Sequence, residues 1–305
     1  MSDSMDRFGM GWLPDYPDFR DYTPEASSIS PRLKRLGQQK PIKAMLTAVG
    51  VMGKTRLRLP ATVDLREWCS PIENQGALGS CTANAGVGVV EYFERRAFGR
   101  HVDASRLFLY KVTRSLMHKQ GDRGAFLRTT MGGLVLFGVP PEEHWPYDVS
   151  QVDAEPPAFC YAYTQSYQAI SYYRLDPPGT TQEALLARIK ANLAGGLPSM
   201  FGFTVYSSYT QAAASGKIPF PTGGEPVAGG HAIVAVGYDD GMKIRNANPG
   251  GAATTGAFLI RNSWGTAWGA AGYGWLPYEY VLSGLAQDWW SLLKNEWIDT
   301  GEFKV

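Results

Sequence analysis

Apolar residues recur at helical spacing directly after residue 81, and this stretch gives the clearest structural signal in the chain. From Val89 to Ala97 the apolar side chains follow at steps of three and four, while the charged residues lie mostly off that stripe. Ser80 is a residue type that caps helices, so we expect Cys81 to lie in the first turn. Similar patterns predict three further helices, at 105–117, 127–137 and 181–194.

The second half of the chain shows short runs that are typical of strands. Alternation at 167–170 and apolar stretches at 198–205, after His231 and around Ile260 predict four of them. The glycine-rich stretch 246–256 separates the last two strands and is expected to be a flexible hairpin tip. Three tryptophans near the end have spacings that predict a docked turn or helix anchoring the core: Trp289, Trp290 and Trp297.

Composition narrows the functional classes. A chain of 305 residues has ample apolar material for one or two domains, and its net charge of +1 offers no attraction to nucleic acid or anionic membranes. No apolar run is long enough to span a bilayer. The first residues lack a secretion signal, so we expect a cytoplasmic protein or export by a non-classical route. No His or Cys cluster has metal-ligand spacing, and no metal or cofactor is expected.

The three cysteines differ in setting. Cys81 lies where the free amides and dipole of a helix N-terminus favour a thiolate. Alone, it would be interpreted as a small apolar residue at the start of a core helix. Cys69 and Cys160 are candidates for a disulfide, which a reducing cytosol would keep open. The choice of a catalytic base is limited to four histidines: His101, His118, His144 and His231.

Two motifs downstream change the interpretation of Cys81. Residues 229–238 read GGHAIVAVGY, a histidine followed by alanine and an apolar strand, and residues 258–269 read FLIRNSWGTAWG. In the stretch NQGALGSCTANA at 74–85, a glutamine precedes the cysteine by six residues. These three motifs, in this order and at these separations, resemble the papain-like cysteine peptidases of family C1. The resemblance covers about residues 59–277.

The resemblance implies an α+β fold with a helical left domain, an antiparallel β-barrel right domain and the active-site cleft between them. We expect the helical domain at 60–164 and the β-rich domain at 165–305. Residues 1–59 lie outside this core. Their first part, 11–22, is aromatic, acidic and rich in proline, which predicts an extended segment with large side chains to bury. Residues 32–58 hold eight Lys or Arg and no Asp or Glu, with one weak helix around 42–49.

Two explanations for residues 1–59 stay open. They are a propeptide-like segment that lies over the active-site groove and moderates activity, or a permanent structural strap on the body. Family members are commonly made as zymogens, which favours the first explanation. The helical pro-domain pattern of the family is missing here, so inhibition would use a different geometry. The basic stretch is expected to be a mobile, cleavable linker.

The resemblance also implies the roles of the reacting groups. Cys81 would be the nucleophile and His231 its proton partner, resting as a thiolate and an imidazolium. Asn262 would accept a hydrogen bond from the other imidazole nitrogen, and Trp264 would shield that contact from water. Gln75 and the backbone N–H of Cys81 would hold the oxyanion that forms during acyl transfer.

This chain departs from the family signature on either side of the nucleophile. Leu78 stands in place of a half-cystine and Thr82 in place of an aromatic residue. The loop disulfide of the plant and animal enzymes is therefore absent, and the wall beside the thiol is smaller and more polar. These departures point to a bacterial-type member.

The family's substrate-binding glycines are not found at the most obvious place. Gly132 and Gly133 fall inside a predicted helix, so the substrate strand is assigned to Gly124 and Ala125, where a peptide backbone can approach closely. An apolar pocket is expected for the side chain two positions before the cut. The remaining candidates for substrate binding are Phe126, Phe203, Ala232 and Trp264.

Two other functions use the same motifs. The Cys-His-Asn set also suits a thiol amidase or acyltransferase with a non-peptide acceptor, and the fold also suits a non-catalytic peptide-binding domain. The presence of all four reacting groups favours the peptidase. We therefore expect a monomeric endopeptidase that acts on peptides or proteins, with no nucleic-acid or membrane partner.

Overall fold

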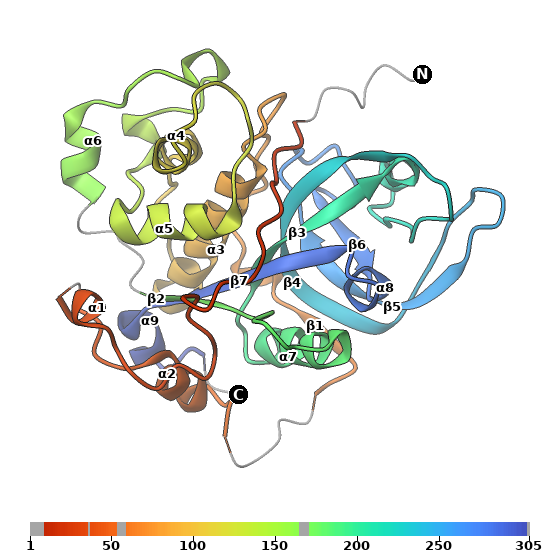
Figure 1. Ribbon diagram of the computed structural model, residues 1–305, viewed down its shortest axis with the longest axis horizontal. Helices are drawn as coiled ribbons and strands as arrows, with labels where there is room; N and C mark the ends of the chain where they lie inside the picture. The colour runs from red at the N-terminus through yellow and green to blue at the C-terminus, as the bar shows by residue number, and fades with distance from the viewer. Residues whose placement is uncertain (1–8, 36, 54–58, 165–170, 304–305) are drawn as a thin grey trace.

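The computed structural model describes residues 9–35, 37–53, 59–164 and 171–303. Figure 1 shows a group of helices on one side and a twisted antiparallel sheet on the other. The predicted helices are confirmed. One of them, α3, begins at Cys81 and ends at Phe98, and Gly99 caps it with a left-handed φ of 69°. The helical group is α3 (Cys81–Phe98), α4 (Arg106–Leu116), α5 (Leu127–Leu136) and α6 (Ala158–Tyr163).

The strands form one antiparallel sheet in the order β2-β7-β3-β4-β5-β6, with β1 paired to β4. The α+β fold is therefore confirmed, although β2 and β6 remain as the two edges and do not close a barrel within the part described. The strands are β1 (Thr62–Asp64), β2 (Ser171–Arg174), β3 (Ser199–Tyr206), β4 (Val227–Arg245), β5 (Ala253–Arg261), β6 (Tyr273–Pro277) and β7 (Ala286–Leu293).

Shorter elements complete the chain. Helix α7 (Gln182–Ala194) was predicted, and the Thr181 side chain caps it by accepting from the Ala184 N–H. The remaining elements are α1 (Pro31–Arg35), α2 (Ile42–Ala48), α8 (Glu279–Leu282), α9 (Asn295–Asp299) and the 3-10 turns η1 (Arg66–Trp68), η2 (Glu142–His144), η3 (Val149–Gln151) and η5 (Ser207–Ala212).

Two predictions for the second half need correction. Trp289 and Trp290 lie in strand β7 and not in a turn or helix, because both indoles pack in the core beside the sheet. Trp289 stacks on Phe201 with ring centroids 3.8 Å apart. The turn between β4 and β5 is not a loose tip, since buried Asn246 donates to the Phe220 carbonyl. The predicted strand at 167–170 lies outside the described residues.

The N-terminal region packs on the body along much of its length. Helix α2 lies against α9, and its side chains Met45 and Leu46 are fully buried. This part of the predicted linker, residues 37–53, is therefore packed on the body and is not mobile, while residues 36 and 54–58 of the predicted linker lie outside the described residues. Ahead of the linker Tyr16 and Phe19 remain exposed, contrary to the expectation that all large side chains of 11–22 are buried.

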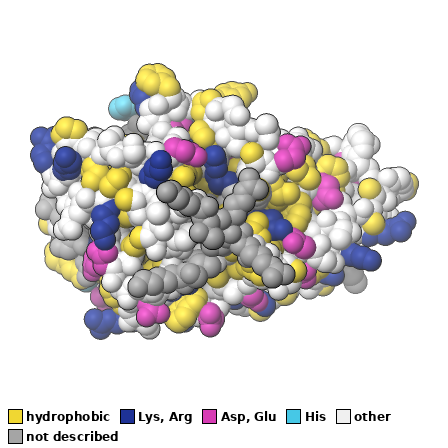
Figure 2. Space-filling view, turned by 90° about the horizontal axis from the view of Figure 1, so that it is seen from below, with side chains coloured by type: hydrophobic (Ala, Val, Ile, Leu, Met, Phe, Trp, Pro, Cys, Tyr) yellow, Lys and Arg dark blue, Asp and Glu magenta, His cyan; other side chains and the backbone are white. Residues whose placement is uncertain are grey.

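The described part of the chain contains no disulfide bond. Cys69, Cys81 and Cys160 are all free and buried, so the candidate bridge between Cys69 and Cys160 is not formed. On the face shown in Figure 2, basic and acidic side chains are interspersed with hydrophobic ones. Among the described helices, none is both long and apolar enough to cross a membrane.

The packing of α2 predicts a loss of stability when its core side chain is shortened. Met45→Ala should lower the free energy of unfolding by about 2–4 kcal/mol because it leaves a cavity between α2 and α9. Lys43→Ala, on the exposed side of the same helix, is the matched control and should change it by less than about 0.5 kcal/mol. Urea unfolding measures both. Equal, small effects would show that α2 is not part of the cooperative core.

Candidate active site

Helix α3 places Cys81 at its first residue, as the sequence predicted, but the Ser80 side chain does not cap the helix. The Ser80 Oγ instead lies 2.5 Å from the Tyr147 hydroxyl and accepts from Asn84 Nδ2 at 3.1 Å. The preceding turn is tied to the helical half because the Gly79 N–H donates to the Asp122 carboxylate at 2.9 Å. These bonds fix the loop that carries the thiol.

His231 reaches the same place from the sheet. It lies on β4 next to Ala232, whose backbone N–H is hydrogen-bonded to the Cys81 thiol. The His231 Nε2 is 2.9 Å from Asn262 Oδ1, and this oxygen also accepts from the Ser263 N–H at 2.8 Å. Because the oxygen is the acceptor, Nε2 carries the proton and Nδ1 has a free lone pair. Within the described chain His231 Nδ1 has no hydrogen-bond partner.

Two neighbours hold these groups in orientation. Trp264 stacks on the His231 ring with centroids 4.4 Å apart and planes 22° apart. The Ser263 hydroxyl donates to Gln75 Oε1 at 2.5 Å, which turns the Gln75 Nε2 the other way. Sequence reasoning missed Ser263, although it directly follows Asn262 in the motif. The structure thus brings together Gln75, Cys81, Ala232, His231, Asn262 and Trp264.

Residues 9–13, here called the covering segment, cross this site. The Gly9 carbonyl accepts from Gln75 Nε2 at 2.8 Å, and the Gly11 N–H is hydrogen-bonded to the Cys81 thiol. The Gly11 carbonyl accepts from the Ala125 N–H at 2.7 Å, and the Leu13 N–H donates back to Ala125. In Figure 1 this red segment descends between the helices and the sheet. Both Cys81 and His231 are fully buried beneath it.

The sheet side of the covering segment is held through Trp12. Its N–H donates to the Gly230 carbonyl at 3.1 Å, and its buried indole lies on Gly202 and Gly230. The indole Nε1 donates to Asp288 Oδ2 at 3.2 Å. Neither Gly202, Gly230 nor Asp288 was a sequence candidate. We call the surroundings formed by these three residues the Trp12 pocket.

The predicted lining residues fall in different places. Ala125 pairs with the covering segment as described, and the Gly124 N–H donates to the Tyr110 hydroxyl. Phe203 is buried beside Phe201, and its ring centroid is 6.0 Å from that of His231. It lies on the face of β3 opposite to Gly202, so Gly202 is the residue that faces Trp12. Phe126 is partly exposed with Lys119 5.4 Å from its ring centroid.

Burial under the covering segment determines the protonation states of Cys81 and His231. Desolvation raises the pKa of the Cys81 thiol to about 11, against the lowering effect of the nearby backbone N–H groups. Desolvation also lowers the pKa of His231 to about 4, with the Asn262 hydrogen bond acting the other way. At neutral pH the covered site therefore holds a thiol and a neutral imidazole. The thiolate–imidazolium pair implied by the family resemblance is not the state of the covered site.

The family assignment follows from comparison with known proteins. The sequence profile described as papain family cysteine protease matches residues 59–291, which is more than half of the chain and includes all three motifs. The chain belongs to the papain family of cysteine proteases. The expected enzyme class, a cysteine peptidase of family C1, is thereby confirmed.

Individual relatives agree with this membership. This cysteine protease is 34% identical over 223 residues to the uncharacterized peptidase C1-like protein L477 of Acanthamoeba polyphaga mimivirus, covering 71% of the chain and 68% of that relative. It is 29% identical to cathepsin K of Gallus gallus over 71% of the chain. The chain spans only 58% of the length of that cathepsin.

The solved structure of xylellain, a cysteine protease from Xylella fastidiosa, is similar over nearly the whole chain. The TM-score is 0.69 at 31% identity, with 93% of this chain and 96% of xylellain covered. The coverage thus extends beyond the matched family region into the N-terminal part. The bacterial type that Leu78 and Thr82 predicted agrees with this likeness.

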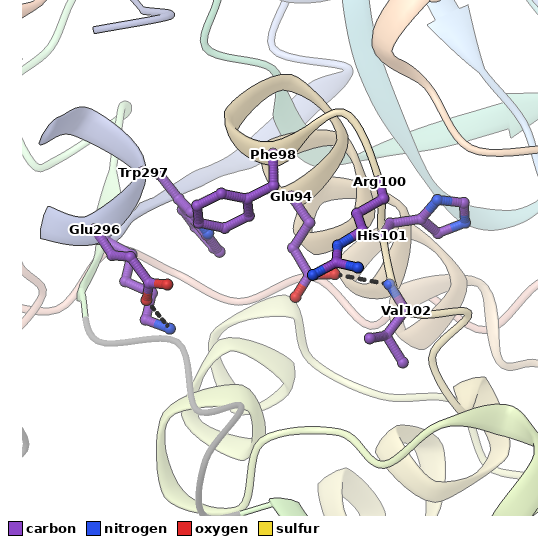
Figure 3. A pocket seen from close by; sticks show the side chains of 8 residues that line it. Glu94, Phe98, Arg100, His101, Val102, Glu296 and Trp297 are labelled. Carbon is purple, nitrogen blue, oxygen red and sulfur yellow. Dashed lines mark hydrogen bonds and ion pairs between the residues drawn. The ribbon is translucent and has the colours of Figure 1, made fainter. Parts of the chain in front are cut away.

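A cavity of about 470 Å³ lies elsewhere on the protease, near the other end of α3 (Figure 3). Since α3 has 18 residues, this end is about 25 Å from Cys81. No cysteine lines the cavity, and burial lowers the pKa of its His101. The histidine is therefore not paired with a thiol. The lining residues are Glu94, Phe98, Arg100, His101, Val102, Lys294, Glu296 and Trp297.

The raised pKa of Cys81 predicts very little thiolate in the full-length protease at neutral pH. At pH 8 a thiol with a pKa of about 11 is roughly one part in a thousand ionised. The ultraviolet absorbance of the thiolate, taken as the difference between the full-length protease and its Cys81→Ala variant, should therefore stay near zero around neutral pH and appear only in strongly alkaline solution. A difference signal that is already complete below pH 8 would contradict a neutral covered thiol.

Proposed function

We propose that this protease is an endopeptidase that cleaves through a Cys81 acyl-enzyme and that residues 9–13 hold it inactive until they are displaced. The observation that carries the proposal is the covering segment itself. A stretch of peptide lies across the thiol, hydrogen-bonded to Ala125 on one side and Gly230 on the other. The site therefore fits an extended peptide backbone, and it is filled by one from its own chain.

Chemistry begins once the covering segment leaves. The free lone pair of His231 Nδ1 takes the proton of the Cys81 thiol, while Asn262 holds Nε2–H. The thiolate attacks a peptide carbonyl carbon to give a tetrahedral oxyanion. His231 returns the proton to the departing amine as the C–N bond breaks, leaving an acyl-enzyme. Water then attacks the thioester with His231 as base, and the carboxylate product and the free thiol are released.

The oxyanion is stabilised by a donor that is already aimed at a carbonyl. Gln75 Nε2 now donates to the Gly9 carbonyl, and the Ser263 hydroxyl on Gln75 Oε1 fixes that orientation. The first amides of α3 lie at the same point because Cys81 begins the helix. Substrate carbonyls would replace Gly9 there. One such donor contributes roughly 3 kcal/mol to lowering the barrier.

The nucleophile assignment predicts the effect of removing the thiol. Cys81→Ala should reduce the cleavage of a casein or mixed-peptide substrate to background, a loss of at least about 10⁴-fold, because no acyl-enzyme forms. Cys160→Ala removes a buried free thiol elsewhere and should retain activity. Both are compared as activated protease, with circular dichroism to verify folding. Activity that survives in Cys81→Ala would refute the assignment.

The covering role predicts activation by a single substitution in the full chain. Trp12→Ala removes a buried indole, and a loss of about 3 kcal/mol corresponds to a roughly 100-fold larger uncovered fraction. Peptide hydrolysis and Cys81 alkylation at pH 7 should both rise by about that factor. Phe19→Ala alters an aromatic residue of the same region that is 92% exposed, and it should leave both rates unchanged. Equal rates in the two variants would show that Trp12 does not hold the cover in place.

A further inference from the structure

The Trp12 pocket contains a carboxylate that the peptidase chemistry does not use. Asp288 is fully buried on β7, with a left-handed φ of 62°. Its backbone N–H donates to Asp176 Oδ2 at 2.8 Å, which holds the residue in that conformation. A buried carboxylate is costly unless it is satisfied, so its partners indicate what the pocket is built to receive.

The two oxygens of Asp288 have different partners. Oδ1 accepts from the indole Nε1 of Trp290 at 2.6 Å and lies 3.2 Å from Arg174 Nη1. Oδ2 accepts from the indole Nε1 of Trp12. The Trp290 indole and Arg174 belong to the body of the protein, and only Trp12 belongs to the covering segment. When that segment leaves, Oδ2 is the acceptor that loses its donor.

The charges around Asp288 favour a neutral donor over a cation. Arg174 is shared with Asp176 at 2.9 Å, so one guanidinium faces two carboxylates. Burial raises the pKa of Asp288 to about 7, so this carboxyl group carries only part of its charge at neutral pH. A guanidinium or ammonium that entered the pocket would also approach Arg174, which lies 3.2 Å from Asp288 Oδ1. A neutral N–H donor avoids that repulsion.

The walls of the pocket suit a broad flat ring. A Cβ at Gly202 would overlap the Trp12 indole, and a Cβ at Gly230 would meet its backbone carbonyl and ring edge. The two glycines lie on adjacent strands, β3 and β4, where Gly202 pairs with Ala232 and Gly230 pairs with Thr204, so at both glycines the indole lies directly on the backbone. Any larger residue at either position would shorten the pocket.

We propose that Asp288 makes the main specificity pocket of this protease select an indole side chain, tryptophan in preference to phenylalanine, leucine or arginine. The inference rests on the proposed function, since it assigns the Trp12 pocket to the substrate side chain that replaces Trp12. The flat ring lies on Gly202 and Gly230, and its N–H satisfies Asp288 Oδ2. Specificity of this kind comes from leaving a buried acceptor unpaired when the ligand lacks the donor.

The test uses the full-length Trp12→Ala variant and covalent probes that need the pocket but no turnover. The probes are peptidyl acyloxymethyl ketones that differ only in the second residue before the reactive group. That residue is tryptophan, its sulfur isostere benzothienylalanine, phenylalanine, leucine or arginine. The second-order rate of Cys81 labelling is followed by mass spectrometry. We expect the tryptophan probe to react roughly 10- to 100-fold faster than the benzothienyl probe, which has the same shape without the N–H. Phenylalanine, leucine and arginine should all fall below tryptophan.

Variants then assign the preference to Asp288. In Trp12→Ala/Asp288→Ala the ratio of tryptophan to benzothienyl rates should fall to about one. Trp12→Ala/Asp153→Asn neutralises a carboxylate that pairs with buried Arg114 in the helical half and takes no part in the Trp12 pocket, and it should keep the ratio. If the Asp288 variant does not fold, the ratio of the tryptophan and benzothienyl rates in Trp12→Ala alone still tests the indole preference.

The outcomes separate the two proposals. Equal rates for the isosteric pair, or a faster arginine probe, would overturn the indole preference and leave the peptidase assignment intact. Absence of Cys81 labelling by every probe, in a protein that melts cooperatively, would overturn the proposed function together with this inference.

Discussion

The hydrogen bonds between the covering segment and the two halves of the protein are the interaction on which the rest of the site depends. They join the helical half at Ala125 to the sheet at Gly230 through three consecutive residues. The covering segment can pass this close to the body because glycine residues lie on both sides of the contact. A Cβ on Gly11 would overlap the backbone of Gly79, and one on Gly124 would overlap Gly11. Gly124 also has a φ of 68°, which other residues adopt at a cost.

The positions of the candidate site residues in the fold were largely predictable from the sequence because these residues lie in short motifs. Cys81, His231 and Asn262 lie on α3, β4 and directly after β5, and local patterns predicted all three elements. The α+β fold and the family follow from the same motifs. Ser263 is the exception within a motif, since a serine there has no signal of its own until its hydroxyl is seen on Gln75.

The walls around the site were not predictable, and the physical reason is distance in sequence. Trp12, Gly202 and Asp288 come from three remote parts of the chain and share no pattern. In a strand, successive side chains point to opposite faces, so an error of one residue in the position assigned to the pocket selects the wrong face. For this reason the sequence pointed to Phe203, although its neighbour Gly202 faces the indole. The tryptophans of β7 were misassigned because apolar residues buried on both faces of a strand show no alternation.

Covering the site changes its chemistry as well as its access. In the covered state burial favours an uncharged thiol and an uncharged ring, because neither can be solvated. We infer that uncovering returns water and lets the proton pass from sulfur to nitrogen, so that the reactive thiolate exists only when a substrate can enter. The cover then protects the thiol from alkylating and oxidising agents in addition to blocking peptides.

The two explanations for the N-terminal region apply to different parts of it. Residues 37–53 have fully buried side chains at Met45 and Leu46, and removing them would expose core surface, as expected for a brace. The covering segment contributes one large buried side chain, and the residues after it are held by the Arg128 ion pairs with Asp15 and Asp21. The pair with Asp15 is partly exposed on both sides and weakens with salt, whereas Asp21 is only 4% exposed. Because the covering segment buries one large side chain and the brace buries several, we infer that the first part can leave the active site while the second stays in place.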